Sequence, residues 1–324
     1  MRVLVLHSDV APDAPADEQD TLYSAASVAE ALEKHGHQAP QAAFAPDMAF
    51  LKGLLDRHRP DVVFNVVESV FGAGIYSSLA PAMLDRLGVP YTGATAAHFA
   101  ATTDKPFGKN VLRVGGVVTP NWAVGPDWDG LDPGATYIVK AADEDSSVGI
   151  DDNSVVRGFE VRARAEFCRQ KFGGRWFAEQ YVDGREFNIA VMAGEHGPRV
   201  FPLAEMCFNT EWPDGKPKLV SFAAKWEEGT FDYNGSQRQF GCETAEPALG
   251  RALIDTTKKI WSLFSLRGYA RVDYRVDADG MPWALEINPN CCISPDAGFA
   301  AAAEEAGIPY DELINRVALA ALHA

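Results

Sequence analysis

Long apolar segments are absent from this sequence of 324 residues, and positive charge is scarce. No segment approaches the roughly 20 apolar residues that a membrane-spanning helix needs, and the apolar start Met1–Leu6 is too short for a signal peptide. The 29 lysines and arginines oppose 45 aspartates and glutamates, so the formal net charge is −16. Because this charge repels phosphate backbones, we expect no nucleic acid as partner, and because a spanning segment is lacking we expect no membrane.

Cysteine is also infrequent, and its pattern argues against structural disulfides and zinc. The cysteines are odd in number and lack the spacing of a zinc site. They are Cys168, Cys207, Cys242, Cys291 and Cys292. We therefore expect reduced thiols in a cytoplasmic protein. Cys291 or Cys292 could be a reactive thiol, although small buried cysteines that serve packing are more common.

The first hundred residues alternate strand and helix patterns. Apolar runs at Val3–Leu6 and Asp61–Val67 predict strands, whereas Thr21–His35 and Ile75–Leu87 place apolar residues at helical spacing. This alternation predicts a small parallel α/β domain, in which ligands bind beyond the carboxyl ends of the strands. Four polar residues follow the predicted strand ends: His7, Ser8, Glu68 and Ser69.

Acidic residues of this region could recognise a substrate amine. Glu68 could hold an ammonium group, as could Asp17 or Glu18, although Glu68 could equally pair with a nearby cation for structural reasons. Asp17 and Glu18 belong to the segment Asp9–Asp20, which is rich in alanine, proline and aspartate. We interpret this segment as either a loop that closes over a ligand or a surface linker.

The middle of the chain carries a pattern suited to phosphate. The predicted strand Tyr137–Lys140 ends in a lysine, and the small residues Ser146–Gly149 follow it. Backbone N–H groups of such a loop can approach phosphate oxygens closely, and the lysine supplies compensating charge. A second predicted strand, Trp176–Val182, leads to Arg185–Met192, where Glu186 could accept hydrogen bonds from sugar hydroxyls.

Two late strands form a predicted hairpin with polar side chains on one face. The strands Gly268–Val276 and Met281–Ile287 flank the turn Asp277–Gly280, whose Asp-Gly pair is a hairpin signal. Residues two apart on a strand share a face. Four polar residues have this spacing: Arg271, Asp273, Glu286 and Asn288. Their oxygens suit Mg²⁺ shared with phosphates, which predicts a nucleotide metal site; the alternative is a pair of surface carboxylates.

These motifs, taken in order, resemble the ATP-grasp fold and specifically the D-alanine:D-alanine ligase family. The resembling segments are Ser24–Leu32, Pro90–Gly93, Thr103–Lys105, Val139–Lys140, Glu144–Gly149, Glu179–Glu186, Arg271–Asp273 and Glu286–Pro289. The resemblance implies an α/β chain with three domains. An amino-terminal parallel α/β domain that binds substrate, the pre-ATP-grasp domain, spans 1–100. A central ATP-grasp subdomain spans 101–184, and a carboxyl-terminal subdomain with the metal and catalytic residues spans 185–324.

The resemblance also implies roles for individual residues. The residues implied to contact ATP are Lys105, Lys140, Ser146, Ser147, Val148, Glu179, Gln180, Tyr181, Val182, Glu186 and Lys225. The implied ligands of two Mg²⁺ ions, for which Mn²⁺ could substitute, are Asp273, Glu286 and Asn288. The implied catalytic residues are Arg271, Lys225 and Ser146, and the expected substrate contacts are Glu68, Asp17, Glu18, Arg271 and Asn290.

The implied activity is that of an ATP-dependent carboxylate–amine ligase acting on small molecules. ATP would phosphorylate a carboxylate, and an amine would then displace phosphate from the acyl phosphate. The turn-rich segment Phe208–Gly241 would close as a lid and exclude water. A homodimer through the amino-terminal domain is possible in such a protein. The alternatives are an ATP-grasp kinase that releases a phosphorylated product and a non-catalytic nucleotide-binding protein.

The chain departs from the family pattern in both substrate pockets. The family's Gly-Gly-x-Ser turn is absent after the first strand, and its His-Gly pair is replaced by Glu68-Ser69. Trp226 stands where the family has a tyrosine, and the segment Asn290–Gly298 lacks its Pro-Gly and Ser-Leu pairs. We therefore expect amino-acid-like substrates other than those of standard D-alanyl-D-alanine synthesis.

Overall fold

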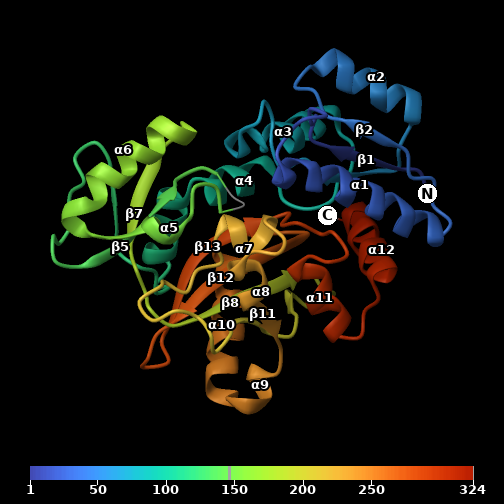
Figure 1. Ribbon diagram of the computed structural model, residues 1–324. Helices are drawn as coiled ribbons and strands as arrows, with labels where there is room; N and C mark the ends of the chain where they lie inside the picture. The colour runs from blue at the N-terminus through green and yellow to red at the C-terminus, as the bar shows by residue number, and fades with distance from the viewer. Residues whose placement is uncertain (145–146, 324) are drawn as a thin grey trace.

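The strands of the computed structural model form three sheets (Figure 1). The model describes residues 1–144 and 147–323, and it describes the backbone but not the side chains of Asp17 and His323. The predicted ATP contact Ser146 therefore lies outside the described residues. Among the described helices, none is both long and apolar enough to cross a membrane.

The first sheet is parallel and has the strand order β2-β1-β3. Its elements are β1 (Val3–His7), α1 (Ala16–Lys34), β2 (Gln41–Ala43), α2 (Met48–His58), β3 (Val62–Val66), η1 (Gly74–Tyr76) and α3 (Leu79–Leu87). The described side chains of β1 and β3 are almost entirely buried, as expected for parallel strands covered on both faces. The predicted parallel α/β domain is thus confirmed.

The predicted loop Asp9–Asp20 is wrong in its second half, because α1 begins at Ala16. Asp17 and Glu18 therefore lie in the first turn of a helix. The first turn is polar, so apolar periodicity does not indicate that a helix begins there. Acidic residues in this position are nevertheless favourable, because a helix amino terminus carries partial positive charge. The predicted helix Ile75–Leu87 is also divided, since η1 precedes α3.

The second sheet is antiparallel, with the order β4-β7-β5-β6. The elements from here to the end of this sheet are α4 (Ala96–Thr103), α5 (Lys105–Val114), β4 (Trp122–Val124), β5 (Thr136–Ala141), η2 (Asp152–Ser154), β6 (Val155–Arg157), η3 (Gly158–Glu160), α6 (Val161–Phe172) and β7 (Trp176–Gln180). Helix α6 covers one face, where Val161, Ala165 and Cys168 pack on Tyr137 and Trp176. Both strands predicted here exist, although β7 ends at Gln180.

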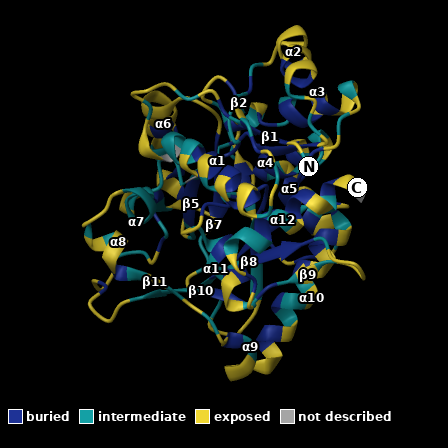
Figure 2. Ribbon diagram, turned by 90° about the vertical axis from the view of Figure 1, so that its right-hand side faces the viewer, coloured by how far each residue is buried: buried dark blue, intermediate teal, exposed yellow. Residues whose placement is uncertain are grey.

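The third sheet has the order β11-β10-β8-β12-β13, with β9 paired to β8. Its elements are β8 (Arg185–Met192), β9 (Arg199–Val200), β10 (Ala204–Phe208), α7 (Phe222–Trp226), α8 (Phe231–Gly235), β11 (Ser236–Gln239), α9 (Cys242–Ala245), α10 (Pro247–Leu263), β12 (Tyr269–Val276) and β13 (Pro282–Pro289). Strand β8 is deeply buried, whereas α8 and β11 at the edge are more exposed (Figure 2). The predicted hairpin is confirmed as β12 and β13.

The carboxyl-terminal helices return to the amino-terminal domain. They are α11 (Gly298–Glu305), α12 (Tyr310–Ala320) and η4 (Ala321–His323). Helix α12 lies against α1 (Figure 1), and Leu32 and Ile314 share one buried cluster. The sheets β1–β3, β4–β7 and β8–β13 each fall inside one of the predicted ranges 1–100, 101–184 and 185–324. We propose these ranges as the domains.

Candidate active site

One cavity of about 1710 Å³ collects residues from the second and third sheets, from α1 and from the segment that follows β3. Every predicted site residue lines it, apart from Ser146 and Asp17, whose side chains the structure does not describe. The predicted residues on its wall are Glu18, Glu68, Lys105, Lys140, Ser147, Val148, Glu179, Gln180, Tyr181, Val182, Glu186, Lys225, Arg271, Asp273, Glu286, Asn288 and Asn290. The structure thus brings them together, while the role of each stays a prediction.

The hairpin side chains are connected to one another. The strand register pairs Arg271 with Asn288 and Asp273 with Glu286, and a bulge follows Asp273. Arg271 donates to both carboxylate oxygens of Asp273, at 2.7 and 2.8 Å, and Asn288 Nδ2 donates to Asp273 Oδ2 at 3.0 Å. A bidentate pair of this kind fixes the planes of both groups. Burial favours the neutral form of Arg271, but the charge of Asp273 outweighs it and raises the pKa of Arg271.

Four cationic side chains of the cavity act on the carboxylate of Glu286. Its burial works against ionisation, but the charges of Lys105, Lys140, Lys225 and Arg271 lower the pKa of Glu286 to about 2. Lys105 Nζ is 3.9 Å from its Oε2 and also donates to the backbone oxygen of Glu144. This carboxylate is therefore ionised at neutral pH, surrounded by cations from α5, β5, α7 and β12.

A buried ionic triad includes two residues of the cavity wall, Lys140 and Glu179. Glu179, which is 1% exposed, lies 2.6 Å from Lys109 Nζ and 2.5 Å from Lys140 Nζ. Despite its burial, the two lysines lower the pKa of Glu179, whereas burial lowers the pKa of Lys109. Our sequence analysis missed Lys109. The available signal was its position four residues after Lys105, on the same face of a helix.

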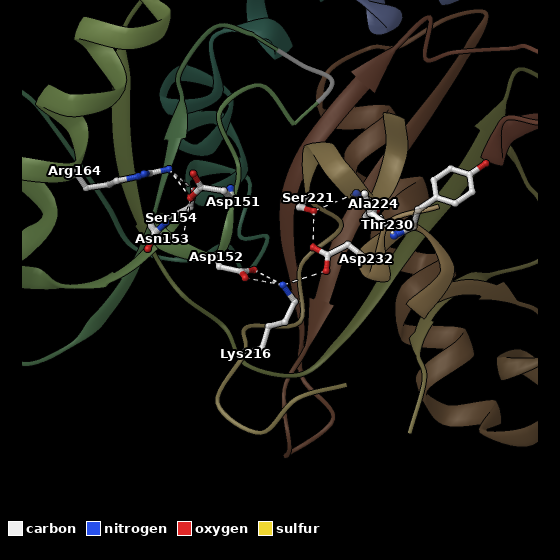
Figure 3. A network of polar contacts seen from close by, with 11 residues as sticks. Asp151, Asp152, Asn153, Ser154, Arg164, Lys216, Ser221, Ala224, Thr230 and Asp232 are labelled. Atoms are coloured by element: carbon white, nitrogen blue, oxygen red, sulfur yellow. Dashed lines mark hydrogen bonds and ion pairs between the residues drawn. The ribbon is translucent and has the colours of Figure 1, made fainter. Parts of the chain in front are cut away.

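The lid segment 208–241 contacts the loop that follows β5. Figure 3 shows Lys216 Nζ between Asp152, at 2.5 and 2.7 Å, and Asp232, at 3.1 Å. Ser147 Oγ donates to the backbone oxygen of Val220 at 3.0 Å. These contacts join residues of the proposed central and carboxyl-terminal subdomains, and Ser147, Asp152, Val220 and Asp232 line the cavity.

Lys225 lies on α7 within this lid. The helix begins after Ser221, whose hydroxyl accepts from Ala224 N and donates to Asp232 (Figure 3). Among the described residues Lys225 has neither a hydrogen-bond nor an ion-pair partner, and burial together with Arg271 lowers the pKa of Lys225. The predicted lid therefore brings Lys225 to the cavity without a direct ion pair to any described residue, while Asp273, Glu286 and Glu186 act on its pKa from a greater distance.

Gly149 shapes the turn beside the described residues Ser147 and Val148. Its φ is +69°, and a Cβ atom there would lie 2.6 Å from the ring of Trp176. Glycine is consequently required both by the backbone conformation and by the ring. The turn lines the cavity, as the predicted phosphate loop requires.

The amino-terminal end of the cavity is acidic. Ser8 Oγ accepts from the backbone N–H groups of Glu68 and Ser69, both at 3.1 Å, and Thr21 donates to Glu68 at 3.4 Å. Asp20, which our sequence analysis missed, also lines this end, and burial raises the pKa of Asp20. The sequence pattern did not predict a helix here; because α1 begins at Ala16, Asp20 lies one helical turn after Asp17 and shares its face.

The two adjacent cysteines differ in their partners. Cys292 Sγ is 3.0 Å from Asp20 Oδ2 and 3.2 Å from Ser294 Oγ. Burial raises the pKa of Cys291 to about 12 and raises the pKa of Cys292 well above its ordinary value. Both thiols therefore stay protonated at neutral pH, which favours packing over reactivity.

Asn290 connects two of the proposed domains through its side chain. Oδ1 accepts from Ala94 N at 2.8 Å, and Nδ2 donates to the backbone oxygen of Asn65 at 3.2 Å. A Cβ atom on Gly93 would lie 2.0 Å from Asn290 Oδ1, so glycine permits this approach. Both polar groups of the amide thus serve the domain junction, and its predicted substrate contact stays a prediction.

The oxygen donors of the hairpin suit magnesium. Within the described ranges, no group of three or more His, Cys, Asp or Glu side chains could hold a metal ion. The available donors are the carboxylates of Asp273 and Glu286 and the amide oxygen of Asn288, whose Nδ2 is already directed at Asp273. Two carboxylates and an amide fit a Mg²⁺ that completes its shell with water and phosphate oxygens.

Known proteins resemble the chain along nearly its whole length. The family model described as D-ala D-ala ligase C-terminus matches residues 134–318. An uncharacterized protein of Sinorhizobium fredii, y4sG, is 30% identical over 90% of this chain and 85% of its own length. The D-alanine–D-alanine ligase of a Synechococcus species is 29% identical over 77% of this chain and 73% of its own.

Solved structures show the same fold. The D-alanine–D-alanine ligase of Bacillus anthracis complexed with ATP superposes with a TM-score of 0.77, covering 100% of this chain and 98% of that chain at 19% identity. The predicted ATP-grasp fold is therefore confirmed. The family model and the relatives establish that the chain belongs to the D-alanine:D-alanine ligase family and is an ATP-dependent carbon–nitrogen ligase.

Proposed function

We propose that the enzyme activates a substrate carboxylate as an acyl phosphate, joins it to an amine and releases ADP and phosphate. The observation that carries this proposal is the convergence of cations on one carboxylate-bearing hairpin. Lys105, Lys140, Lys225 and Arg271 all act on Glu286 within the same cavity. Phosphoryl transfer depends mainly on positioning and on stabilising negative charge, which this arrangement supplies.

Arg271 and Lys225 are the proposed catalytic residues. Arg271 is held by Asp273 and keeps its charge, so it can stabilise the oxyanion that forms when the amine attacks. Lys225 lacks a partner among the described residues and reaches the cavity from the lid, where it can accompany the transferring phosphoryl group. Lid closure excludes water, which would otherwise hydrolyse the acyl phosphate.

ATP is proposed to lie between the second and third sheets. Lys105, Lys140 and the described part of the 146–149 loop would contact the phosphates. The segment Glu179–Val182 would border adenine, because it passes from the end of β7 along the cavity wall. Glu186 would bind the ribose, which requires it to share its oxygens with Arg275, now 2.9 Å away.

Two Mg²⁺ ions, replaceable by Mn²⁺, are the proposed cofactors. Asp273, Glu286 and Asn288 would hold them, and the ions would neutralise phosphate charge during transfer. Asp273 now directs both oxygens at Arg271, so a metal there must share an oxygen with the guanidinium.

The proposed substrates are amino-acid-like but differ from those of standard D-alanyl-D-alanine synthesis. Glu68 and Asp20 form an acidic end suited to an ammonium group, and both line the cavity. Trp226 and parts of the segment Asn290–Gly298, namely residues 290–292 and 296–298, line the same cavity and differ from the family pattern. Homodimerisation through the amino-terminal domain stays a prediction.

Nucleotide analysis across a substrate panel tests this function. Purified protein is incubated with ATP, Mg²⁺ and pairs of L-, D- and β-amino acids, and we expect ADP and phosphate in equal amounts with an amide product. Asp273→Asn should abolish the product, whereas Arg251→Gln, an exposed change on α10, should not. Formation of AMP and pyrophosphate would refute the proposal, and phosphate retained on an acceptor would identify a kinase instead.

A further inference from the structure

Arg238 is a cavity residue that none of the proposed roles uses. It lies on β11, opposite Met206 of β10, which in turn lies opposite Glu186 of β8. Directly paired residues of neighbouring strands share a face, and all three line the cavity. Arg238 is partly buried, yet it makes neither a hydrogen bond nor an ion pair with any described residue.

The surroundings of this guanidinium are positive. Burial and the charge of Arg271 lower the pKa of Arg238, and Asp296 offsets part of this effect without coming within ion-pair distance. The guanidinium also lies against the first residue of α11: a Cβ atom on Gly298 would be 3.3 Å from Nη2. The amino terminus of a helix carries partial positive charge, and no carboxylate of the described residues lies within ion-pair distance of Arg238.

We propose that Arg238 is a specificity-determining residue that binds the carboxylate of the amine substrate. This inference rests on the proposed ligase function and adds a recognition group on β11. The carboxylate to be activated must approach the phosphate groups near Glu286, so it cannot also neutralise Arg238. A second carboxylate, on an incoming amino acid, can do so, and the planar fork of arginine matches its two oxygens. Because Gly298 has no side chain, it leaves space beside the Arg238 guanidinium for the substrate carboxylate.

A binding test with acetate examines Arg238 without turnover. The melting temperature of the protein, with ADP and MgCl₂ present, is compared in sodium acetate and in sodium chloride of equal ionic strength. Acetate should add a stabilising increment, because binding to the folded state raises its stability. Arg238→Gln should lose at least half of that increment, while Arg251→Gln should keep it. Retention of more than half by Arg238→Gln would overturn the inference.

Kinetics then identify the substrate group that Arg238 binds. For the amino acid that serves as amine in the panel, Arg238→Gln should raise KM by about 10- to 100-fold, as expected for losing hydrogen bonds to a charged group. The KM for ATP should stay within about threefold, and Arg238→Lys should recover part of the loss because it restores the charge.

A substrate analogue separates recognition from misfolding. The carboxamide of the same amino acid should be a poor amine for the wild type, and Arg238→Gln should not impair it further. Equal losses for acid and amide, or a change in kcat alone, would overturn the inference. If no amino acid supports turnover, the proposed function fails, and the acetate measurement alone then decides whether Arg238 binds a carboxylate.

Discussion

Replacing Glu179 with glutamine leaves Lys109 and Lys140 without their shared counter-charge. Glu179 is 1% exposed and contacts the two ammonium groups at 2.6 and 2.5 Å, so little water can reach the position of the lost carboxylate. Removing one partner of a buried ion pair costs about 3–5 kcal/mol. At about 2 °C per kcal/mol for a chain of this size, the melting temperature should fall by roughly 6–10 °C.

Calorimetry on a graded set of variants checks this prediction. Lys109→Met leaves Glu179 paired with Lys140 and should lower the melting temperature less than Glu179→Gln does. Glu166→Gln removes an exposed carboxylate that pairs with Arg169 at 2.7 Å, and it should leave the melting temperature unchanged within about 1 °C. A fall of less than about 2 °C for Glu179→Gln would refute the claim that the triad stabilises the fold.

Three further predictions concern the charged groups of the cavity and its lid. Because cations lower the pKa of Glu286 from 4.5 to about 2, its ionisation stabilises the folded state fully above pH 4.5. The difference in melting temperature between wild type and Glu286→Gln should therefore shrink as the pH falls from 4.5 toward 2. Lys225→Ala should lower kcat at least about 100-fold in the ADP-release assay. Because the pKa of Lys225 is lowered, the wild type should lose activity at alkaline pH, and Lys225→Arg should move that loss to higher pH. Lys216→Met should loosen the lid and speed its limited proteolysis by about two- to tenfold relative to Lys258→Met, an exposed control on α10; equal cleavage would contradict the bridging role of Lys216.

The hairpin was predictable because its signals are local. The Asp-Gly turn and the alternation of polar and apolar residues predict two strands whose polar side chains share a face, and the observed register places Asp273 opposite Glu286. The lysine at the end of β5 and the loop that follows it are contiguous in sequence, so the pattern also predicts Lys140 at a strand end beside that loop.

The missed residues depend on contacts between distant segments. The role of Lys109 follows only from the tertiary fold, which brings its ammonium group within 2.6 Å of Glu179 on β7. Asp20 meets Cys292 across 272 positions of sequence, and the polar first turn of α1 gives no apolar period. Arg238 lies on a short polar strand, Ser236–Gln239, which lacks the alternation that identifies strands. In each case tertiary packing, and not local propensity, places the side chain.

Oxygen transfer from substrate to phosphate tests the acyl-phosphate proposal most directly. The amino acid that supplies the carboxylate is labelled with ¹⁸O in both carboxylate oxygens, and the released phosphate is analysed by mass spectrometry or ³¹P NMR. If that carboxylate attacks the γ-phosphorus and the amine then expels phosphate, each phosphate formed carries one labelled oxygen while the other remains in the amide. Unlabelled phosphate accompanying the same amide product would contradict the proposed route.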